Sequence, residues 1–426
     1  RLLASVQVHD SMNTAFSRSL FVGLTSGLLS GCAAIDALQP PAVVDIVRTI
    51  DHKANITTGD YEQLEDIAAL VFQQIRDIDP QIYPQLQLQS STNFIDEIRQ
   101  QTESGFGPDL IITDSETALA LYRSRLIDPI QLSEQDRQDT PQSLLDLVTA
   151  KDGALVARPV NQFVQLACFN KERLPTAPRT FQDLNQSSSD VTYGLAIQLK
   201  DLFWSAEAFD AGPALKAAMN SSSTDQVHHE TVTAWLSWLV NASYQQNIRF
   251  LNNQDNLRQG LIEGKLDWIT CWSNNLRGLK QTMGETLGVT ALPKGPNQNR
   301  TATTRLEVWA LGRNSSSLQR RKALVMVDFV TKPWAQKTYS LATNSAMPVS
   351  QKAATVVASK IPGGNEALRN YVSAERPQDK MRVKARIFRD PVRYELISDA
   401  LLDTIYDIQT PEQGAEQILQ GLREKR

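Results

Sequence analysis

The sequence has little cysteine, no long apolar run and no excess of basic residues, and each absence excludes a class of protein. Its 3 cysteines, Cys32, Cys168 and Cys271, lack the spacing of a cysteine-based metal site. No apolar stretch reaches the roughly 20 residues that span a bilayer. With 43 Lys and Arg residues against 47 Asp and Glu, the chain has a formal net charge of -4 and no basic stripe, so nucleic acid is not an expected partner.

The motifs of common cofactor-dependent enzymes are missing as well. A helical zinc protease motif that began at His229 would need its second His where Thr233 stands, so we interpret residues 228–230 as a solvated loop and expect no metal. Gly105 and Gly107 precede a strand pattern, whereas the glycines of a dinucleotide loop follow one. The sequence has no Gly-Lys-Ser/Thr phosphate loop and no recognisable Ser/His/Asp spacing. We therefore expect neither a cofactor nor an enzyme.

The N-terminal segment has the pattern of an export signal. Arg18 precedes a short apolar run that ends in small residues. The last four residues, Leu29-Ser-Gly-Cys32, resemble the bacterial lipobox. That resemblance implies cleavage before Cys32, acylation of its thiol and a membrane anchor of several acyl chains. We assign residues 1–31 to upstream residues and a lipoprotein signal peptide, and residues 32–41 to the lipidated Cys and a tether.

The rest of the 426-residue chain is long enough for two lobes with separate cores, and it alternates strand and helix patterns. Residues 43–50 form a β-branched run, and apolar residues follow at helical spacing from Tyr61, where Asp60 and Gln63 predict a capping box. The alternation continues and predicts a parallel sheet with helices on its faces. Further strands are predicted at 86–88, 110–112, 155–156, 163–169, 287–292 and 306–311, and further helices at 93–102, 231–240, 318–330 and from about 392.

Two further cysteines follow the signal, at Cys168 and Cys271. Export makes a disulfide chemically possible. Both residues lie among apolar or aromatic neighbours, however, where buried free thiols are common, so we expect two free thiols.

Four sequence blocks resemble one known family. The blocks are Gly107-Pro-Asp-Leu-Ile-Ile112 with Leu126-Ile-Asp-Pro-Ile130; Cys168-Phe-Asn-Lys171 with Pro178-Arg-Thr-Phe-Gln-Asp-Leu184; Gly260-Leu-Ile-Glu-Gly264 with Leu287-Gly-Val-Thr-Ala-Leu-Pro293; and Ala310-Leu-Gly-Arg-Asn314 with Met347-Pro348. In order and spacing they are similar to the family 1 extracellular solute-binding proteins, the maltose-binding-like group. The blocks cover nearly the whole chain after the signal.

The resemblance implies an α/β periplasmic-binding-protein fold of two lobes, each a sheet flanked by helices, joined by a multi-segment hinge. We expect lobe one to comprise residues 42–160 and 290–345, and lobe two residues 161–289 and 346–426. The implied function is that of a monomeric receptor of an ABC importer, which captures a small polar solute, most readily a sugar or oligosaccharide, and delivers it to permease subunits in the membrane. The protein would then be exported to the periplasm or cell surface.

Candidate solute contacts lie beyond the carboxyl ends of the predicted strands, because ligands of parallel sheets collect there and at lobe interfaces. Carboxylates can accept two sugar hydroxyls, and a Trp ring can stack on a pyranose. Each position also has a structural interpretation: Asp114 can cap the next helix, and Trp side chains usually pack in the core. The candidates are Thr49, Asp51, Asp114, Glu116, Gln162, Gln165, Trp204, Trp272, Asn274, Glu307 and Trp309, with His52 and Trp268 beside them; Trp235, Trp238 and Trp334 are interpreted as structural.

Other functions stay open at this point. An exported glycoside hydrolase could use a carboxylate pair such as Asp114 and Glu307. Within the receptor class, the solute could be a polyamine or a ferric ion. The tyrosines that would bind iron are scattered, with no adjacent pair, at Tyr61, Tyr83, Tyr122, Tyr193 and Tyr244.

Overall fold

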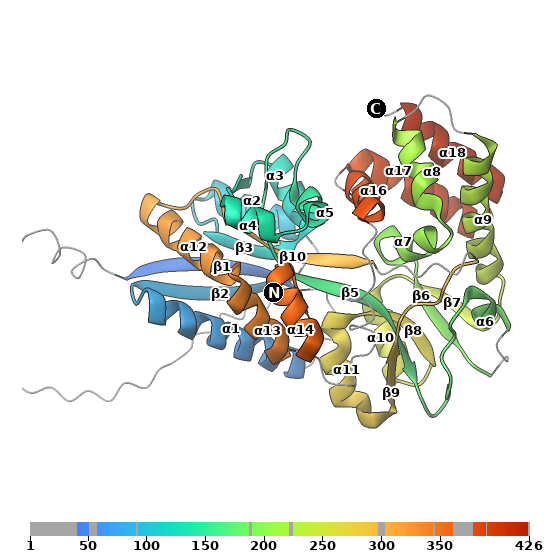
Figure 1. Ribbon diagram of the computed structural model, residues 1–426, viewed down its shortest axis with the longest axis horizontal. Coiled ribbons are helices and arrows are strands. Elements are labelled where there is room, and N and C mark those ends of the chain that lie inside the picture. Colours follow the sequence, from blue (N-terminus) through green and yellow to red (C-terminus); the bar gives the residue numbers. More distant parts are fainter. Residues whose placement is uncertain are drawn as a thin grey trace, which may run out of the picture.

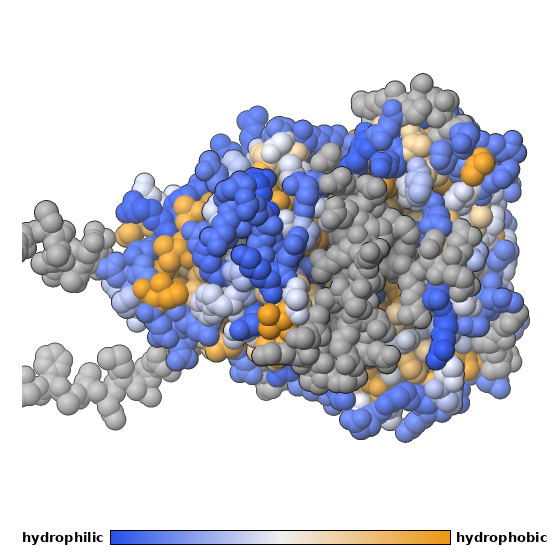
Figure 2. Space-filling model, in the orientation of Figure 1, coloured by the Kyte–Doolittle hydropathy of each residue, from blue (hydrophilic) through white to orange (hydrophobic). Residues whose placement is uncertain are grey.

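The computed structural model describes residues 41–50, 58–90, 93–186, 190–220, 225–296, 303–343, 346–360, 378–388 and 390–424. Cys32, the export signal, Asp51 and His52 lie outside these residues, and so does nearly all of the tether. The described elements form two α/β lobes that share one sheet (Figure 1). On the face shown in Figure 2, most of the coloured surface is hydrophilic, and hydrophobic residues form small separate groups.

The first lobe starts with the predicted parallel sheet. β1 (Ala42–Ile50) pairs in parallel with β2 (Ile82–Ser90) and with β3 (Leu110–Asp114), and α1 (Thr58–Ile78) and α2 (Phe94–Glu103) connect them. The predicted capping box at Asp60 is wrong. The helix begins at Thr58, three residues before the Tyr61 start that the apolar pattern indicated, so Asp60 lies inside its first turn.

A single long strand joins the lobes. β5 (Arg158–Asn170) pairs in its first half with β10 (Thr304–Gly312), and in its second half with β8 (Trp268–Trp272) and β9 (Leu287–Thr290). β11 (Met347–Pro348) pairs with the middle of β5. With β6 (Tyr193–Ala196) and β7 (Ile248–Leu251), the strand order is β2-β1-β3-β10-β5-β8-β6-β7, and β4 (Ile127–Asp128) pairs with β10.

Helices cover both halves of this sheet (Figure 1). Those grouped with the first lobe are α3 (Ser115–Arg123), α4 (Glu134–Asp139), α5 (Gln142–Leu145), the 3-10 turn η2 (Asp146–Val148), α12 (Ser317–Val330), α13 (Pro333–Thr343) and α14 (Gln351–Lys360). Those grouped with the second lobe are α6 (Phe181–Gln186), α7 (Leu199–Ala208), α8 (Ala211–Asn220), α9 (Gln226–Ser243), α10 (Gln254–Ile262), η3 (Ser273–Asn275), α11 (Leu276–Met283), η4 (Gly284–Thr286), α16 (Gln378–Phe388), α17 (Pro391–Ile405) and α18 (Pro411–Glu424).

Separate cores lie under the two sets of helices. One cluster of buried apolar residues draws on chain segments between Val44 and Val160 and between Leu306 and Val349. Two other clusters draw chiefly on segments between Val164 and Leu292 and between Val383 and Leu422. Each core thus combines segments far apart in the sequence.

The prediction of two free thiols is wrong. Cys168 and Cys271 form a disulfide between β5 and β8, with their Cα atoms 5.8 Å apart. The apolar surroundings that we took as the mark of free thiols surround a buried disulfide equally well. What the sequence did not reveal is that strands separated by 103 residues pair side by side.

The histidine pair is also placed differently from the prediction. His228 and His229 do not lie in a loop but in the first turns of α9, which Asp225 caps by accepting from the His228 N–H at 2.9 Å. Within the described residues, no group of His, Cys, Asp and Glu side chains is arranged to hold a metal ion. Nor does any described helix have the length and apolarity needed to cross a bilayer.

Candidate functional site

The wall of lobe one that faces the other lobe begins at Asp114, the last residue of β3. Its Oδ1 accepts from the Thr117 N–H at 2.8 Å and so caps α3, and its Oδ2 lies 3.3 Å from the Arg305 guanidinium. Burial alone would raise the pKa of Asp114, but the Arg305 charge and the Thr117 N–H hold it below its ordinary value. The predicted contact Thr49 is nearby and donates from Oγ1 to Thr113 Oγ1 at 3.0 Å.

Glu116 lies in the first turn of α3, next to this cap, and its pKa is shifted in the opposite direction to that of Asp114. Burial and the neighbouring charge of Asp114 raise the pKa of Glu116, and the Lys384 ammonium opposes that shift. Lys384 belongs to α16, far along the chain. The structure therefore brings two predicted contacts, Asp114 and Glu116, together with cations that sequence reasoning did not identify.

The opposing wall is centred on Asp201, in the first turn of α7 and only 2% exposed. Its Oδ1 accepts from Trp272 Nε1 at 2.9 Å and from Gln254 Nε2 at 3.1 Å, while Gln165 Nε2 donates to the Asp201 carbonyl oxygen at 2.8 Å. Burial raises the pKa of Asp201, against the charges of Lys200 and Arg305 and these hydrogen bonds. These side chains come from β5 and from the carboxyl ends of β6, β7 and β8, the edge at which ligands of parallel sheets bind.

Three buried acceptors at this wall have no donor. Asp201 Oδ2, Gln165 Oε1 and Gln254 Oε1 accept no hydrogen bond from any residue that the structure describes. A buried oxygen without a donor is unfavourable, so these atoms would gain from a molecule that brings hydroxyl or N–H groups. The wall therefore suits a solute rich in hydrogen-bond donors.

Charges of the two walls act on each other directly. The Lys384 ammonium interacts with Glu116 of lobe one and with Asp201 and Glu207 of lobe two, and Lys200 of lobe two interacts with Asp114 of lobe one. Burial chiefly raises the pKa of Tyr394 to about 12, with Glu116 and Asp201 adding to the shift. We call the following set the interlobe cluster: Asp114, Glu116, Lys200, Asp201, Glu207, Arg305 and Lys384.

Two predicted contacts lie outside this cluster, on β10. Glu307 pairs with Arg48 and accepts from Asn161 Nδ2 at 2.9 Å, and both Glu307 and Trp309 line a cavity of about 60 Å³ beneath α1 and α13. Glu307 is the register partner of Asp114, but the two carboxylates have different charged partners, Arg48 and Arg305. The structure thus ties Glu307 to the interior of lobe one.

The predicted tryptophan platforms are mostly core residues. Trp204 is fully buried and packs against Phe181, with ring centroids 5.2 Å apart, and Trp268 packs against Tyr193 at 5.8 Å. Trp272 is nearly buried but contacts Asp201. Neither Trp204 nor Trp268 presents a ring face to the space between the lobes in this arrangement.

The remaining predicted positions lie near the lobe crossing. Gln162 is buried on β5 and donates to the Pro348 carbonyl oxygen at 3.0 Å, where β5 and β11 cross between the lobes. Asn274 is half-buried in η3, directly after β8. Gln165 is the position at the crossing that reaches the Asp201 wall.

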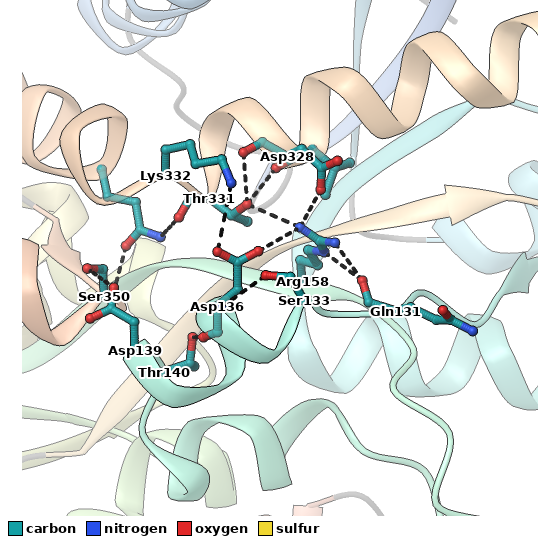
Figure 3. Close-up of polar contacts among 12 residues, drawn as sticks. Gln131, Ser133, Asp136, Asp139, Thr140, Arg158, Asp328, Thr331, Lys332 and Ser350 are labelled. Atoms are coloured by element: carbon teal, nitrogen blue, oxygen red, sulfur yellow. Dashed lines mark hydrogen bonds and ion pairs between the residues drawn. The ribbon is translucent and has the colours of Figure 1, made fainter.

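A polar network holds the base of the crossing strand (Figure 3). Arg158, the first residue of β5, donates to the Gln131 carbonyl oxygen and lies 2.6 Å from Asp328 and 3.6 Å from Asp136. Beside it, Gln336 Oε1 accepts from the N–H groups of Val349 and Ser350 at 2.8 and 2.9 Å. The network fixes two of the segments that pass between the lobes, β5 and the residues after β11, to the helices of lobe one.

Comparisons with known proteins agree with this architecture. The family described as bacterial extracellular solute-binding protein matches residues 85–363. A comparison with curated proteins finds no match. Solved structures that share the fold include maltose-bound MalE3 of T. maritima, with a TM-score of 0.64 and 16% identity over 90% of this chain and 100% of that chain.

Two further solved structures have the same architecture. The GacH receptor of Streptomyces glaucescens has a TM-score of 0.66 and 12% identity over 89% of this chain and 98% of its own. MalX of Streptococcus pneumoniae has a TM-score of 0.63 and 15% identity over 90% and 100%. Because these sequence identities are low, the similarity shows that the chain shares the two-lobed fold of these proteins and nothing further.

Proposed function

Because the chain belongs to the bacterial extracellular solute-binding proteins, we propose that it is the substrate-binding receptor of an ABC importer and that its solute is a sugar or oligosaccharide. The observation that supports this most is the interlobe cluster, in which polar side chains from the strand ends of both lobes share one space. Proteins of the same fold have been solved with maltose, maltopentaose or acarbose bound.

The chemistry of the two walls fits a polyol. Sugar hydroxyls can donate to the acceptors without a donor at Asp201, Gln165 and Gln254, and they can accept from Lys200 and Arg305. Each hydroxyl bonded by a carboxylate forms a charge-assisted hydrogen bond, which is stronger than one between neutral groups. A solute held by both walls stabilises the closed arrangement by the difference between its affinities for the closed and open forms.

The proposal also includes the compartment of the receptor, its membrane anchor and its lobe boundaries. The disulfide between Cys168 and Cys271 is the kind of bond that persists in oxidising compartments, which supports an exported protein. A lipid anchor at Cys32 would keep a monomeric receptor beside the permease subunits that receive the solute. For the lobes we propose the predicted boundaries, with lobe one at residues 42–160 and 290–345 and lobe two at 161–289 and 346–426, except that α14 packs against α13 and is grouped with lobe one.

A ligand screen by thermal shift tests the solute class. A solute at about 100 times its dissociation constant stabilises the native state by about 2.7 kcal/mol, a visible change in Tm. We expect a shift with one class of sugar and none with polyamines or ferric ion. A response to an amine or iron alone would contradict the sugar assignment, and turnover of an oligosaccharide would replace the receptor by a hydrolase.

The variant Asp201→Asn tests the site itself. The amide can still accept from Trp272 and Gln254, and burial disfavours the charged form of Asp201, so we expect the Tm of the ligand-free protein not to fall. The sugar-induced shift should fall because the charge-assisted bonds are lost. Asp225→Asn, the same substitution at the exposed cap of α9, is the matched control. Equal sugar-induced shifts in the parent and in Asp201→Asn would remove Asp201 from the solute site.

A further inference from the structure

One helix contacts both lobes without being part of the crossing strands. α16 packs against α5 and η2 of lobe one and against α8 and α17 of lobe two. In Figure 1 it lies on the side of lobe two that faces α5. Any opening of the lobes must therefore separate α16 from one of them.

The packing of α16 shows which contact would separate. Val383, Ile387 and Phe388 belong to the core of lobe two, whereas Ala385 alone belongs to the core of lobe one. The Phe388 ring also lies 5.3 Å from the rings of Phe203 and of Tyr394, both in lobe two. Because buried apolar area sets most of the contact free energy, α16 should move with lobe two and separate from lobe one.

The contact with lobe one combines packing of α16 against α5 and η2 with one buried cation. Lys384 is 6% exposed, and its ammonium donates to the carbonyl oxygen of Thr304, the first residue of β10, at 2.8 Å. The same ammonium interacts with Glu116 of lobe one and with Asp201 and Glu207 of lobe two. Without this cation, closure would press like charges of the two lobes together in a space of low dielectric constant.

A second ion pair lies two residues beyond α16. Lys151 of lobe one lies 2.8 Å from Asp390 Oδ2, and Asp390 is the buried residue that caps α17 of lobe two. Lys384 within α16 and Asp390 just after it thus both contact lobe one. Neither contact lies on β5 or β11, the strands about which the lobes turn.

We propose that α16 is a clasp that holds the lobes closed in the absence of solute, and that Lys384 is the cation that permits this closure. Solute enters when the contacts of Lys384 and Asp390 with lobe one are released, and α16 swings away with lobe two. The clasp shifts the balance between open and closed forms before any solute is present. It depends on the two-lobed fold and not on which solute binds.

Small-angle X-ray scattering of the full chain without solute tests the clasp. We expect Lys384→Met, which keeps most of the length of the side chain and removes its charge, to increase the radius of gyration at neutral pH. Lys265→Met is the matched control, because Lys265 lies on the surface of lobe two and forms an ion pair with Glu263 of the same lobe. A radius of gyration for Lys384→Met equal to that of the parent, with the Tm unchanged, would overturn the proposal.

Two more variants separate charge from packing. Adding Glu116→Gln to Lys384→Met removes one of the opposed carboxylates, so we expect the radius of gyration to return toward that of the parent. A double variant as expanded as Lys384→Met would overturn the electrostatic role. If Lys384→Met does not fold, Lys151→Met replaces it, because Lys151 is mostly exposed and its substitution should not disturb folding. A radius of gyration of Lys151→Met equal to that of the parent would count against the clasp. Since no solute is used, failure of the sugar assignment leaves these results unaffected.

Discussion

Removing the disulfide between Cys168 and Cys271 should destabilise lobe two much more than lobe one. The bond joins β5 to β8, and both strands belong to the part of the sheet that carries Asp201 and its neighbours. The double variant Cys168→Ala with Cys271→Ala removes the bond and leaves side chains that fit an apolar interior. Lobe one contains neither residue and should keep its stability.

The size of the effect follows from the length of chain that the bond closes. The two cysteines are separated by 103 residues. Closing a loop of about that length reduces the entropy of the unfolded chain by the equivalent of about 4.7 kcal/mol. Because a domain is typically stable by about 5–15 kcal/mol, the loss could remove a large part of the stability of lobe two.

Urea unfolding followed by tryptophan fluorescence measures this loss. Five of the 7 tryptophans lie in lobe two, at residues 204, 235, 238, 268 and 272, so the signal reports mainly that lobe. Parent protein unfolded with a reductant is the control that separates the cross-link from the change of side chain. A free energy of unfolding within about 1 kcal/mol of the oxidised parent, for both the variant and the reduced protein, would refute the loop-closure argument.

Two further variants test the hinge support and the interlobe cluster. Arg158→Met removes the buried guanidinium that binds Gln131 and Asp328. In urea unfolding it should lower the free energy of unfolding of lobe one by an amount on the order of 3 kcal/mol. The control Lys332→Met, at the exposed edge of the same network, should lower it by less than about 1 kcal/mol. Glu116→Gln should raise the Tm at pH 7, because burial and Asp114 raise the folded-state pKa of Glu116 and its charged form is therefore disfavoured in the folded protein. That gain should shrink as the pH falls through the folded-state pKa and vanish below the ordinary value of 4.5; a gain that persists there would contradict the assignment.

Strands and helices were predictable where the pattern is local. The alternation of strand and helix between residues 43 and 112 predicts a parallel sheet, and the structure confirms it, with β1 paired in parallel with β2 and β3. Position relative to strand ends also predicted that Asp114 lies at the edge of the sheet that faces the other lobe, and its contact with a solute stays a prediction. The same rule could have identified Asp201, which lies five residues after the end of β6.

Contacts between distant segments were not predictable. The pairing of β5 with β8 makes the disulfide, and no local pattern links the two strands. Lys384 lies on a helix without a strand end or a turn motif nearby, so only packing reveals that its ammonium reaches Thr304 and the carboxylates. Tryptophan is a weak indicator for a similar reason: Trp204 and Trp272 have the same side chain, and only the fold puts one in the core and the other against Asp201.

The charge balance of the interlobe cluster bears on the solute class. The cluster holds four carboxylates, Asp114, Glu116, Asp201 and Glu207, and three cations, Lys200, Arg305 and Lys384. An anionic solute would add to the excess of negative charge, and a polyamine, although attracted by that excess, has no acceptor to offer the three cations. A neutral polyol leaves the charge of the cluster unchanged and supplies donors to the acceptors that lack them. We therefore expect neutral sugars to bind more tightly than their acidic or amino derivatives, and a competition assay would measure the difference.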